Sequence, residues 1–158
     1  MNRVTIEIKD HVAVVTLNRP NKMNALDIPM FDAIIAAGEA LTENASVRSV
    51  VLRGAGRAFC AGIDLGNFSA PDGVTSQVLA ERTHGITNKW QKAAWIWREL
   101  PVPVIAAVHG VAFGGGLQIM LGADIKYITA DTKVSILEMK WGIIPDMAGT
   151  QLMRHSVR

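Results

Sequence analysis

Residues 100–123 contain no Asp, Glu, Lys or Arg, so this stretch has to be buried in whatever the chain folds into. Its length would suffice to span a lipid bilayer as a helix. However, it contains two prolines, a histidine, a glutamine and five glycines, three of them consecutive. Such interruptions would leave backbone groups unpaired in lipid. We therefore interpret the stretch as a buried strand, a tight loop and a buried helix.

Short apolar strands alternate with helices along the chain. Strands are predicted at residues 4–8, 12–17, 50–52, 104–108 and 125–129. One helix is predicted to begin after Asp27 as its cap, and the glycines at 114–116 open another. A third is predicted over residues 77–99, with an apolar face formed by Ile86, Trp90, Ala94 and Trp97, and residues 70–73 are expected to be mobile. This order predicts a single α/β domain over residues 1–158 with a mainly parallel sheet.

Composition excludes several classes of protein. Hydrophobic residues make up 49% and charged residues 19%, which is typical of a globular domain. The net charge is +2 and the basic residues are scattered, so no nucleic-acid surface is indicated. Cys60 is the only cysteine, which excludes an intrachain disulfide and a cysteine-based metal cluster. With no signal-peptide core at the N-terminus, we expect a cytoplasmic protein.

Two glycine-containing loops, at residues 59–65 and 109–118, each follow a predicted strand. The second is not a phosphate-binding P-loop, because Gly116 stands where lysine is needed, and Ile119 replaces the last glycine of the dinucleotide pattern. It does place unhindered N–H groups at a helix N-terminus, which suits a developing oxyanion. The alternative is that the glycines only let strand and helix pack closely.

Four segments together resemble the crotonase superfamily, the enoyl-CoA hydratase/isomerase family. They are Asn18-Arg19-Pro20 with Asn24-Ala25-Leu26, the loop at residues 59–65 (FCAGIDL), the glycine triplet at 114–116, and residues 138–151 (EMKWGIIPDMAGTQ). They occur in the family's order and span nearly the whole chain. The resemblance implies a spiral of repeated ββα units and an enzyme that stabilises the enolate of an acyl-CoA thioester. Coenzyme A is then part of the substrate, and neither a metal nor a separate cofactor is expected.

The resemblance also implies a binding site. The N–H groups of Ile63 and Gly115 would polarise the thioester carbonyl. The segment of Asn21, Lys22 and Met23, together with the backbone at Ala61, would hold the nucleotide end. The expected substrate-binding set is completed by Gly62, Asp64, Gly114 and Gln118.

Two acidic residues are the candidate proton carriers. Glu138 matches one of the two glutamates of hydratases, but the position of the other is Gln118, and an amide does not exchange a proton as a carboxyl group does. Isomerisation requires only one base, so an isomerase is favoured over a hydratase. Asp146 follows Glu138 at a spacing similar to that of dienoyl-CoA isomerases, although Glu138 as a surface residue and Asp146 as a helix cap remain alternatives.

Family members usually continue well past the position of Arg158, with helices that close the acyl pocket and pack subunits together. We therefore expect a chain that is short at its C-terminus and associates as a trimer or a dimer of trimers. Other chemistry of the superfamily remains open. So do a non-catalytic acyl-CoA-binding or assembly protein and a nucleotide-binding module unrelated to coenzyme A.

Overall fold

A five-stranded sheet in the order β1-β2-β3-β4-β6 forms one layer of the molecule. The computed structural model describes residues 2–66 and 79–154. The strands of this sheet are β1 (Val4–Lys9), β2 (Val12–Leu17), β3 (Ser49–Gly54), β4 (Val104–Val108) and β6 (Ile125–Ile128). Only β1 runs antiparallel to its neighbour. A second, two-stranded parallel sheet pairs β5 (Val111–Phe113) with β7 (Lys133–Ser135).

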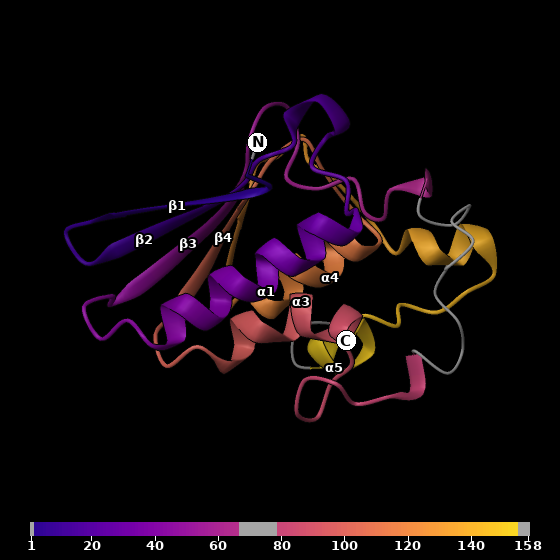
Figure 1. Ribbon diagram of the computed structural model, residues 1–158. Helices are drawn as coiled ribbons and strands as arrows, with labels where there is room; N and C mark the ends of the chain where they lie inside the picture. Colours follow the sequence, from indigo (N-terminus) through magenta and orange to yellow (C-terminus); the bar gives the residue numbers. More distant parts are fainter. Residues whose placement is uncertain (1, 67–78, 155–158) are drawn as a thin grey trace.

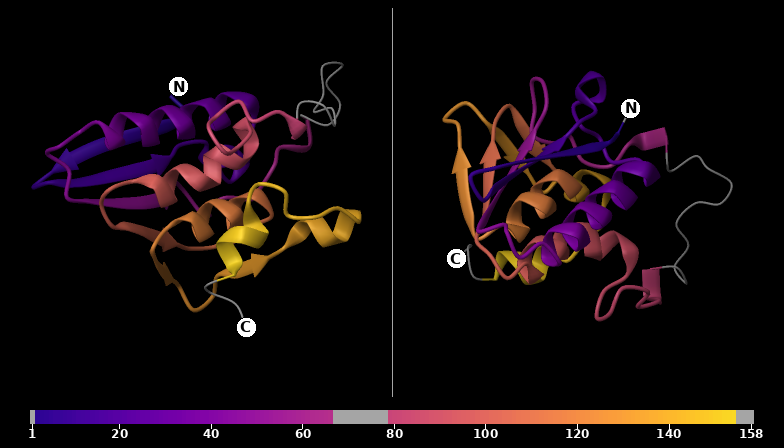
Figure 2. Two further views of the ribbon diagram at one scale, coloured as in Figure 1. Left: turned by 90° about the horizontal axis from the view of Figure 1, so that it is seen from below. Right: turned by 60° about the vertical axis from the view of Figure 1, so that its left-hand side comes forward.

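The helices form the second layer. The helices that lie entirely within the described residues are α1 (Ile28–Thr42), α3 (Lys89–Glu99), α4 (Gly115–Gly122) and α5 (Gly149–Met153), and the 3-10 turns there are η1 (Pro20–Lys22) and η3 (Leu137–Trp141). Figures 1 and 2 show α1, α3 and α4 together on one face of the sheet. Alternate residues of β2, β3 and β4 are buried, as the period of a strand requires. The largest fully buried side chains between the layers are Trp97, Phe31 and Phe59.

The predicted α/β class with a mainly parallel sheet is confirmed. The uncharged stretch at residues 100–123 forms β4, β5 and α4. Alternate residues of β4 and all residues of α4 are buried. Asp27 caps α1, because its carboxylate accepts a hydrogen bond from the N–H of Met30 at 3.0 Å. None of the helices in the described ranges combines the length and apolar character needed to cross a bilayer.

The helix predicted over residues 77–99 is wrong over residues 81–88, which are not helical. The helix α3 begins only at Lys89, where Asn88 and Gln91 form a reciprocal capping box. Such a cap satisfies the first N–H groups and stops the helix from extending backwards. Ile86, expected on the apolar face, is 72% exposed and lies in a turn beside Gly85. Residues 70–73, expected to be mobile, lie outside the described residues, as do 77 and 78.

The contact between α1 and α3 depends on a glycine. A Cβ on Gly38 would lie 2.2 Å from Cγ1 of Ile96. We predict that Gly38→Ala lowers the free energy of unfolding by about 1–2 kcal/mol, because overpacking of about 1–3 kcal/mol exceeds the helix propensity gained. Urea unfolding measures the change, with exposed Ala36→Gly as the control for propensity in the same helix.

An Ile96→Ala background removes the side chain with which the added methyl group would clash. There the same substitution at Gly38 should no longer destabilise the protein. If Gly38→Ala instead stabilises the otherwise unchanged protein, the close packing of α1 on α3 is contradicted.

Candidate active site

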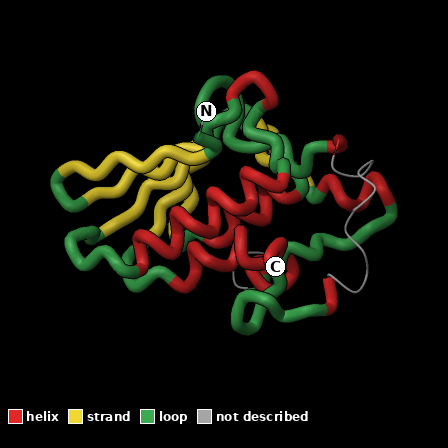
Figure 3. Tube along the Cα trace, viewed as in Figure 1, coloured by secondary structure: helices red, strands yellow, loops and turns green. Residues whose placement is uncertain are grey.

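Two loops that follow neighbouring parallel strands lie side by side at one edge of the sheet. One follows β3 and the other leads from β4 through β5 into α4. The N–H of Phe59 donates to the carbonyl of His109 at 2.9 Å, and the N–H of Phe113 donates to the carbonyl of Cys60 at 3.0 Å. Figure 3 shows these loops gathered where α1 and α4 begin. The carboxyl edge of a parallel sheet is where such folds bind ligands.

The two loops touch through backbone rather than through side chains. A Cβ on Gly62 would lie 2.6 Å from the carbonyl oxygen of Phe113, and Gly62 has a φ of +90°. A Cβ on Gly116 would lie 2.3 Å from the carbonyl oxygen of Cys60. No side chain fits at either position without moving the backbone. The glycines therefore do allow close packing, as the alternative interpretation expected. The same packing brings the two loops together.

This contact brings together two free N–H donors. Ile63 lies opposite Leu26 in a parallel bridge whose bonds are made by its neighbours, Gly62 and Asp64, so the N–H of Ile63 points away from Leu26. Gly115 is the first residue of α4, where N–H groups have no partner within the helix. Within the described residues neither N–H donates to a protein acceptor. A Cβ on Gly62 would lie 3.6 Å from the nitrogen of Gly115, so the two loops meet at these donors.

Glu138 lies directly beside this pair. Its side chain is 9% exposed and comes from η3. The carboxylate packs over Gly114, where an added Cβ would lie 3.2 Å from Oε1. Oε1 accepts a hydrogen bond from Nε2 of Gln118 at 2.6 Å, whereas Oε2 has no hydrogen-bond partner among the described residues. A buried carboxylate oxygen without a partner is costly in a structural role, which favours a functional one.

The orientation of Gln118 follows from its second bond. Its Oε1 accepts from the N–H of Gly149 at 2.9 Å, and a backbone N–H can only donate. The amide NH₂ must therefore face Glu138, so Oε1 of Glu138 is an acceptor and Oε2 is the oxygen able to take a proton. Gln118 is 1% exposed and connects α4, η3 and α5.

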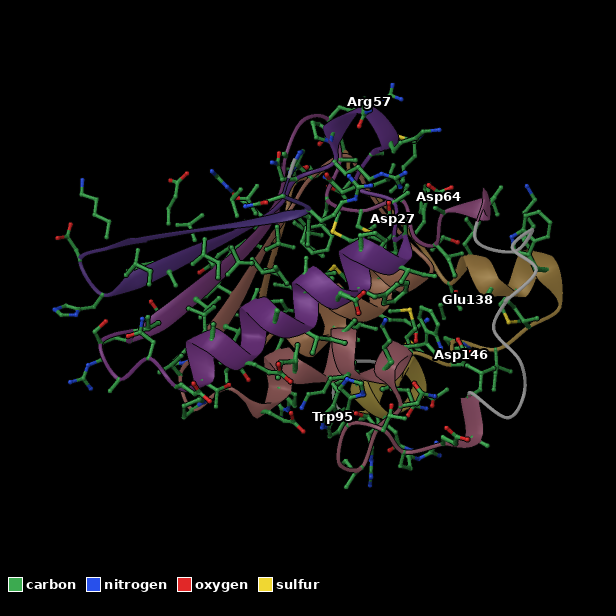
Figure 4. All side chains as sticks on the ribbon, viewed as in Figure 1. Asp27, Arg57, Asp64, Trp95, Glu138 and Asp146 are labelled. Atoms are coloured by element: carbon green, nitrogen blue, oxygen red, sulfur yellow. The ribbon has the colours of Figure 1, made fainter. Side chains whose placement is uncertain are left out.

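Asp146 is brought to the same end of the molecule but is not joined to Glu138. Figure 4 shows the two labelled side chains on the side where η3 and α5 lie. Within the described residues Asp146 makes no hydrogen bond or ion pair with another side chain. Neighbouring protein atoms remove part of the water around its carboxyl group and so raise the pKa of that group above the ordinary value. The residue as a whole is nevertheless exposed to solvent.

The residues expected at the nucleotide end form one strip. Asn21 and Lys22 lie exposed in η1, and Met23 ends that turn with a φ of 49°. The N–H of Ala61 donates to the carbonyl of Met23 at 2.9 Å. This bond places the strip against the loop of residues 59–65, called the Ile63 loop below. Their role in binding a nucleotide stays a prediction.

Asp64 has internal partners that the sequence did not reveal. Its carboxylate contacts Arg19 at 2.6 Å and accepts from the N–H of Gly66 at 3.1 Å. Asn24 was also missed: its fully buried amide donates to the carbonyl oxygens of Ala55, Ala58 and Phe59. Both residues stand in motifs that the sequence singled out, but no local signal indicates partners more than 30 residues away.

Two further ionisable side chains near the loops have structural surroundings. Burial raises the pKa of Cys60 to about 12, so this thiol stays protonated at neutral pH. Nε2 of His109, just after the end of β4, is 2.8 Å from the carbonyl oxygen of Gly56. Within the described residues no group of three His, Cys, Asp or Glu side chains could hold a metal ion.

Comparison with known proteins agrees with this arrangement. The family model "Enoyl-CoA hydratase/isomerase" matches residues 7–157. A Bacillus subtilis protein named probable enoyl-CoA hydratase is 34% identical over 96% of this chain and 56% of its own length. The mouse mitochondrial Delta(3,5)-Delta(2,4)-dienoyl-CoA isomerase is 33% identical over 89% of this chain and 44% of its own length.

Solved structures show the same fold. The enoyl-CoA hydratase of Mycobacterium smegmatis superposes with a TM-score of 0.84 at 30% identity, covering 99% of this chain and 59% of that one. The chain thus spans about half the length of the relatives it matches. The expected crotonase fold is confirmed, and the chain belongs to the enoyl-CoA hydratase/isomerase family.

Proposed function

We propose that this chain carries the catalytic core of an acyl-CoA isomerase that moves a double bond by proton transfer. The observation that carries the proposal is the buried carboxylate of Glu138, with one oxygen held by an amide and the other without a partner among the described residues. A single base of this kind can take a proton from one carbon and return it to another.

In the proposed reaction the thioester carbonyl accepts hydrogen bonds from the N–H groups of Ile63 and Gly115. Oε2 of Glu138 removes a proton from the carbon next to the carbonyl, and the negative charge moves onto the carbonyl oxygen. Two preorganised donors stabilise this oxyanion, and losing one such donor typically costs about 3 kcal/mol in the barrier. The protonated Glu138 then returns the proton further along the conjugated chain, which restores the carboxylate and leaves the mass unchanged.

Gln118 separates this proposal from hydration. Adding water across a double bond calls for two groups that hold and share the water, and an amide at position 118 exchanges no proton at neutral pH. Asp146 is proposed as an auxiliary proton carrier, since partial burial raises the pKa of its carboxyl group above the ordinary value and so favours the protonated form. A hydratase is the second candidate, because relatives at similar identity carry that name.

Self-association and location stay predictions. We propose a trimer, because large apolar side chains are exposed on the segment after Glu138 and along the edge strand β6: Met139, Trp141, Ile143, Ile144, Ile125 and Tyr127. A non-catalytic acyl-CoA-binding protein remains the alternative to an enzyme. The measurement that distinguishes them is an assay with 2-enoyl-, 3-enoyl- and 3,5-dienoyl-CoA, with products identified by mass.

We expect Glu138→Gln to lower kcat by about 10²–10⁴-fold, because the substituted amide cannot accept the substrate proton. Acyl-CoA binding, measured by calorimetry, should be retained, since an amide of the same shape can still accept from Gln118. Glu39→Gln, an exposed glutamate on α1, is the matched control and should change neither quantity. Unchanged turnover in Glu138→Gln would exclude Glu138 as the base.

We expect Gln118→Glu to gain water addition. It places a second carboxyl group 2.6 Å from Glu138 at the present amide position, and two carboxyl groups this close share a proton. With 2-enoyl-CoA, a product heavier by one water should appear at least about tenfold faster than with the unsubstituted protein. Exposed Gln151→Glu is the control. Efficient hydration by the unsubstituted protein would instead show that the isomerase preference is wrong.

A further inference from the structure

One guanidinium group connects three segments around the proposed oxyanion site. Arg19 follows β2, and its Nη1 lies 2.6 Å from Oδ2 of Asp64 and donates to the carbonyl of Ala25 at 3.0 Å. Its Nη2 lies 3.5 Å from Oδ2 of Asp27, the cap of α1. The strand end, the helix cap and the Ile63 loop therefore meet on a single side chain.

The charges around Arg19 alternate in sign. Arg3 contacts Asp27 at 2.6 Å, so the order is Arg3, Asp27, Arg19, Asp64. The side chains of Asp27, Arg19 and Asp64 are only 13–23% exposed, which shields their interactions from solvent more than those of an ordinary surface pair. The hydrogen bond from Arg19 lowers the pKa of Asp64, so this carboxyl group is ionised at neutral pH.

The Ile63 loop has few other attachments on this side. Asp64 directly follows Ile63, and its N–H donates to the carbonyl of Leu26 at 2.9 Å. Leu65, the next residue, is 59% exposed and contributes little burial. The peptide between Gly62 and Ile63 is held by the hydrogen bond that its carbonyl accepts from the N–H of Leu26 at 2.8 Å and by the glycine contacts, and the Arg19–Asp64 pair anchors the loop one residue further on.

We propose that Arg19 is a positioning residue for the reaction: through Asp64 it holds the N–H of Ile63 in the direction required by the thioester oxygen. This inference rests on the proposed function. Arg19 is not expected to touch the substrate. Without it, Asp27 would keep Arg3 but Asp64 would lose its ion-pair partner, and the unpaired, partly buried carboxylate of Asp64 would draw the Ile63 loop toward solvent and away from α1.

The test measures carbonyl polarisation separately from proton transfer. A cinnamoyl-CoA with an electron-donating ring substituent absorbs at longer wavelength when hydrogen bonds polarise its carbonyl. We expect the unsubstituted protein and Glu138→Gln to shift this band, whereas Arg19→Ala should shift it by less than half as much. Turnover by Arg19→Ala should fall about 10–100-fold in kcat with KM within about threefold, less than the full loss of one oxyanion donor.

Companion variants keep the test informative if Arg19→Ala folds poorly. Asp64→Asn keeps the acceptor for Gly66 and removes only the charge, and Arg19→Lys keeps the charge but loses the fork that reaches several acceptors. Both should lower kcat and the band shift in parallel. Adding Asp64→Asn to Arg19→Ala should recover part of the shift by removing the unpaired charge of Asp64. Asp32→Asn, which breaks the remote pair with Lys89, is the control and should change neither.

The outcomes separate the two proposals. No band shift in the unsubstituted protein would overturn the oxyanion site itself, and with it the proposed function. A normal shift and normal kcat in folded Arg19→Lys and Asp64→Asn would overturn the role of Arg19 alone. Reduced thermal stability with unchanged shift and kcat would show that the ion pairs only stabilise the fold, and would also overturn it.

Discussion

The direct contact of backbone with backbone between the two loops is the constraint on which the rest of the site depends. At Gly62 and Gly116 the facing carbonyl oxygens would be 2.6 and 2.3 Å from an added Cβ, closer than real carbon atoms approach. Any side chain there would drive the loops apart. The donors of Ile63 and Gly115 belong to different loops, so their separation is set by this contact. The proximity of the two proposed oxyanion donors is therefore a consequence of how the two loops pack.

The chemistry proposed for the site depends on whether the side-chain atom of residue 118 that faces Glu138 is a nitrogen or an oxygen. Gln118 and Glu138 are both nearly buried, so each of their polar atoms needs a partner or a function. The N–H of Gly149 fixes the amide oxygen, the amide nitrogen fixes Oε1 of Glu138, and only Oε2 remains. A carboxyl oxygen in place of that nitrogen would leave the shape intact and add a proton carrier. One position can thus separate isomerisation from hydration without altering the fold.

Most strands and the cap of α1 could be predicted from the sequence because their signals are local. The start of α3 could not be predicted in this way, since the helical spacing of apolar residues extends back to Ile86. Only the two hydrogen bonds of the capping box between Asn88 and Gln91 mark where the helix begins. The strands β5 and β7 were missed because three residues show no periodicity and their partners are distant. The motifs indicated the candidate site, but Gln118 bonds to residues 20 and 31 positions away, which spacing alone does not indicate.

Ion pairs suit the attachment of the Ile63 loop for a physical reason. In the part of the loop that follows Cys60, Ile63 is only half-buried and Leu65 is exposed, so packing alone does not determine the orientation of that part. Deeply buried charges would be costly, but at 13–23% exposure Asp27, Arg19 and Asp64 keep part of their hydration. Partial burial raises the pKa of Asp27, yet hydrogen bonds from Arg3 and Met30 and the charge of Arg19 outweigh it, and the pKa lies below its ordinary value. Helix cap and loop are therefore held by the same ionised carboxylates, which couples the position of α1 to the orientation of the Ile63 N–H.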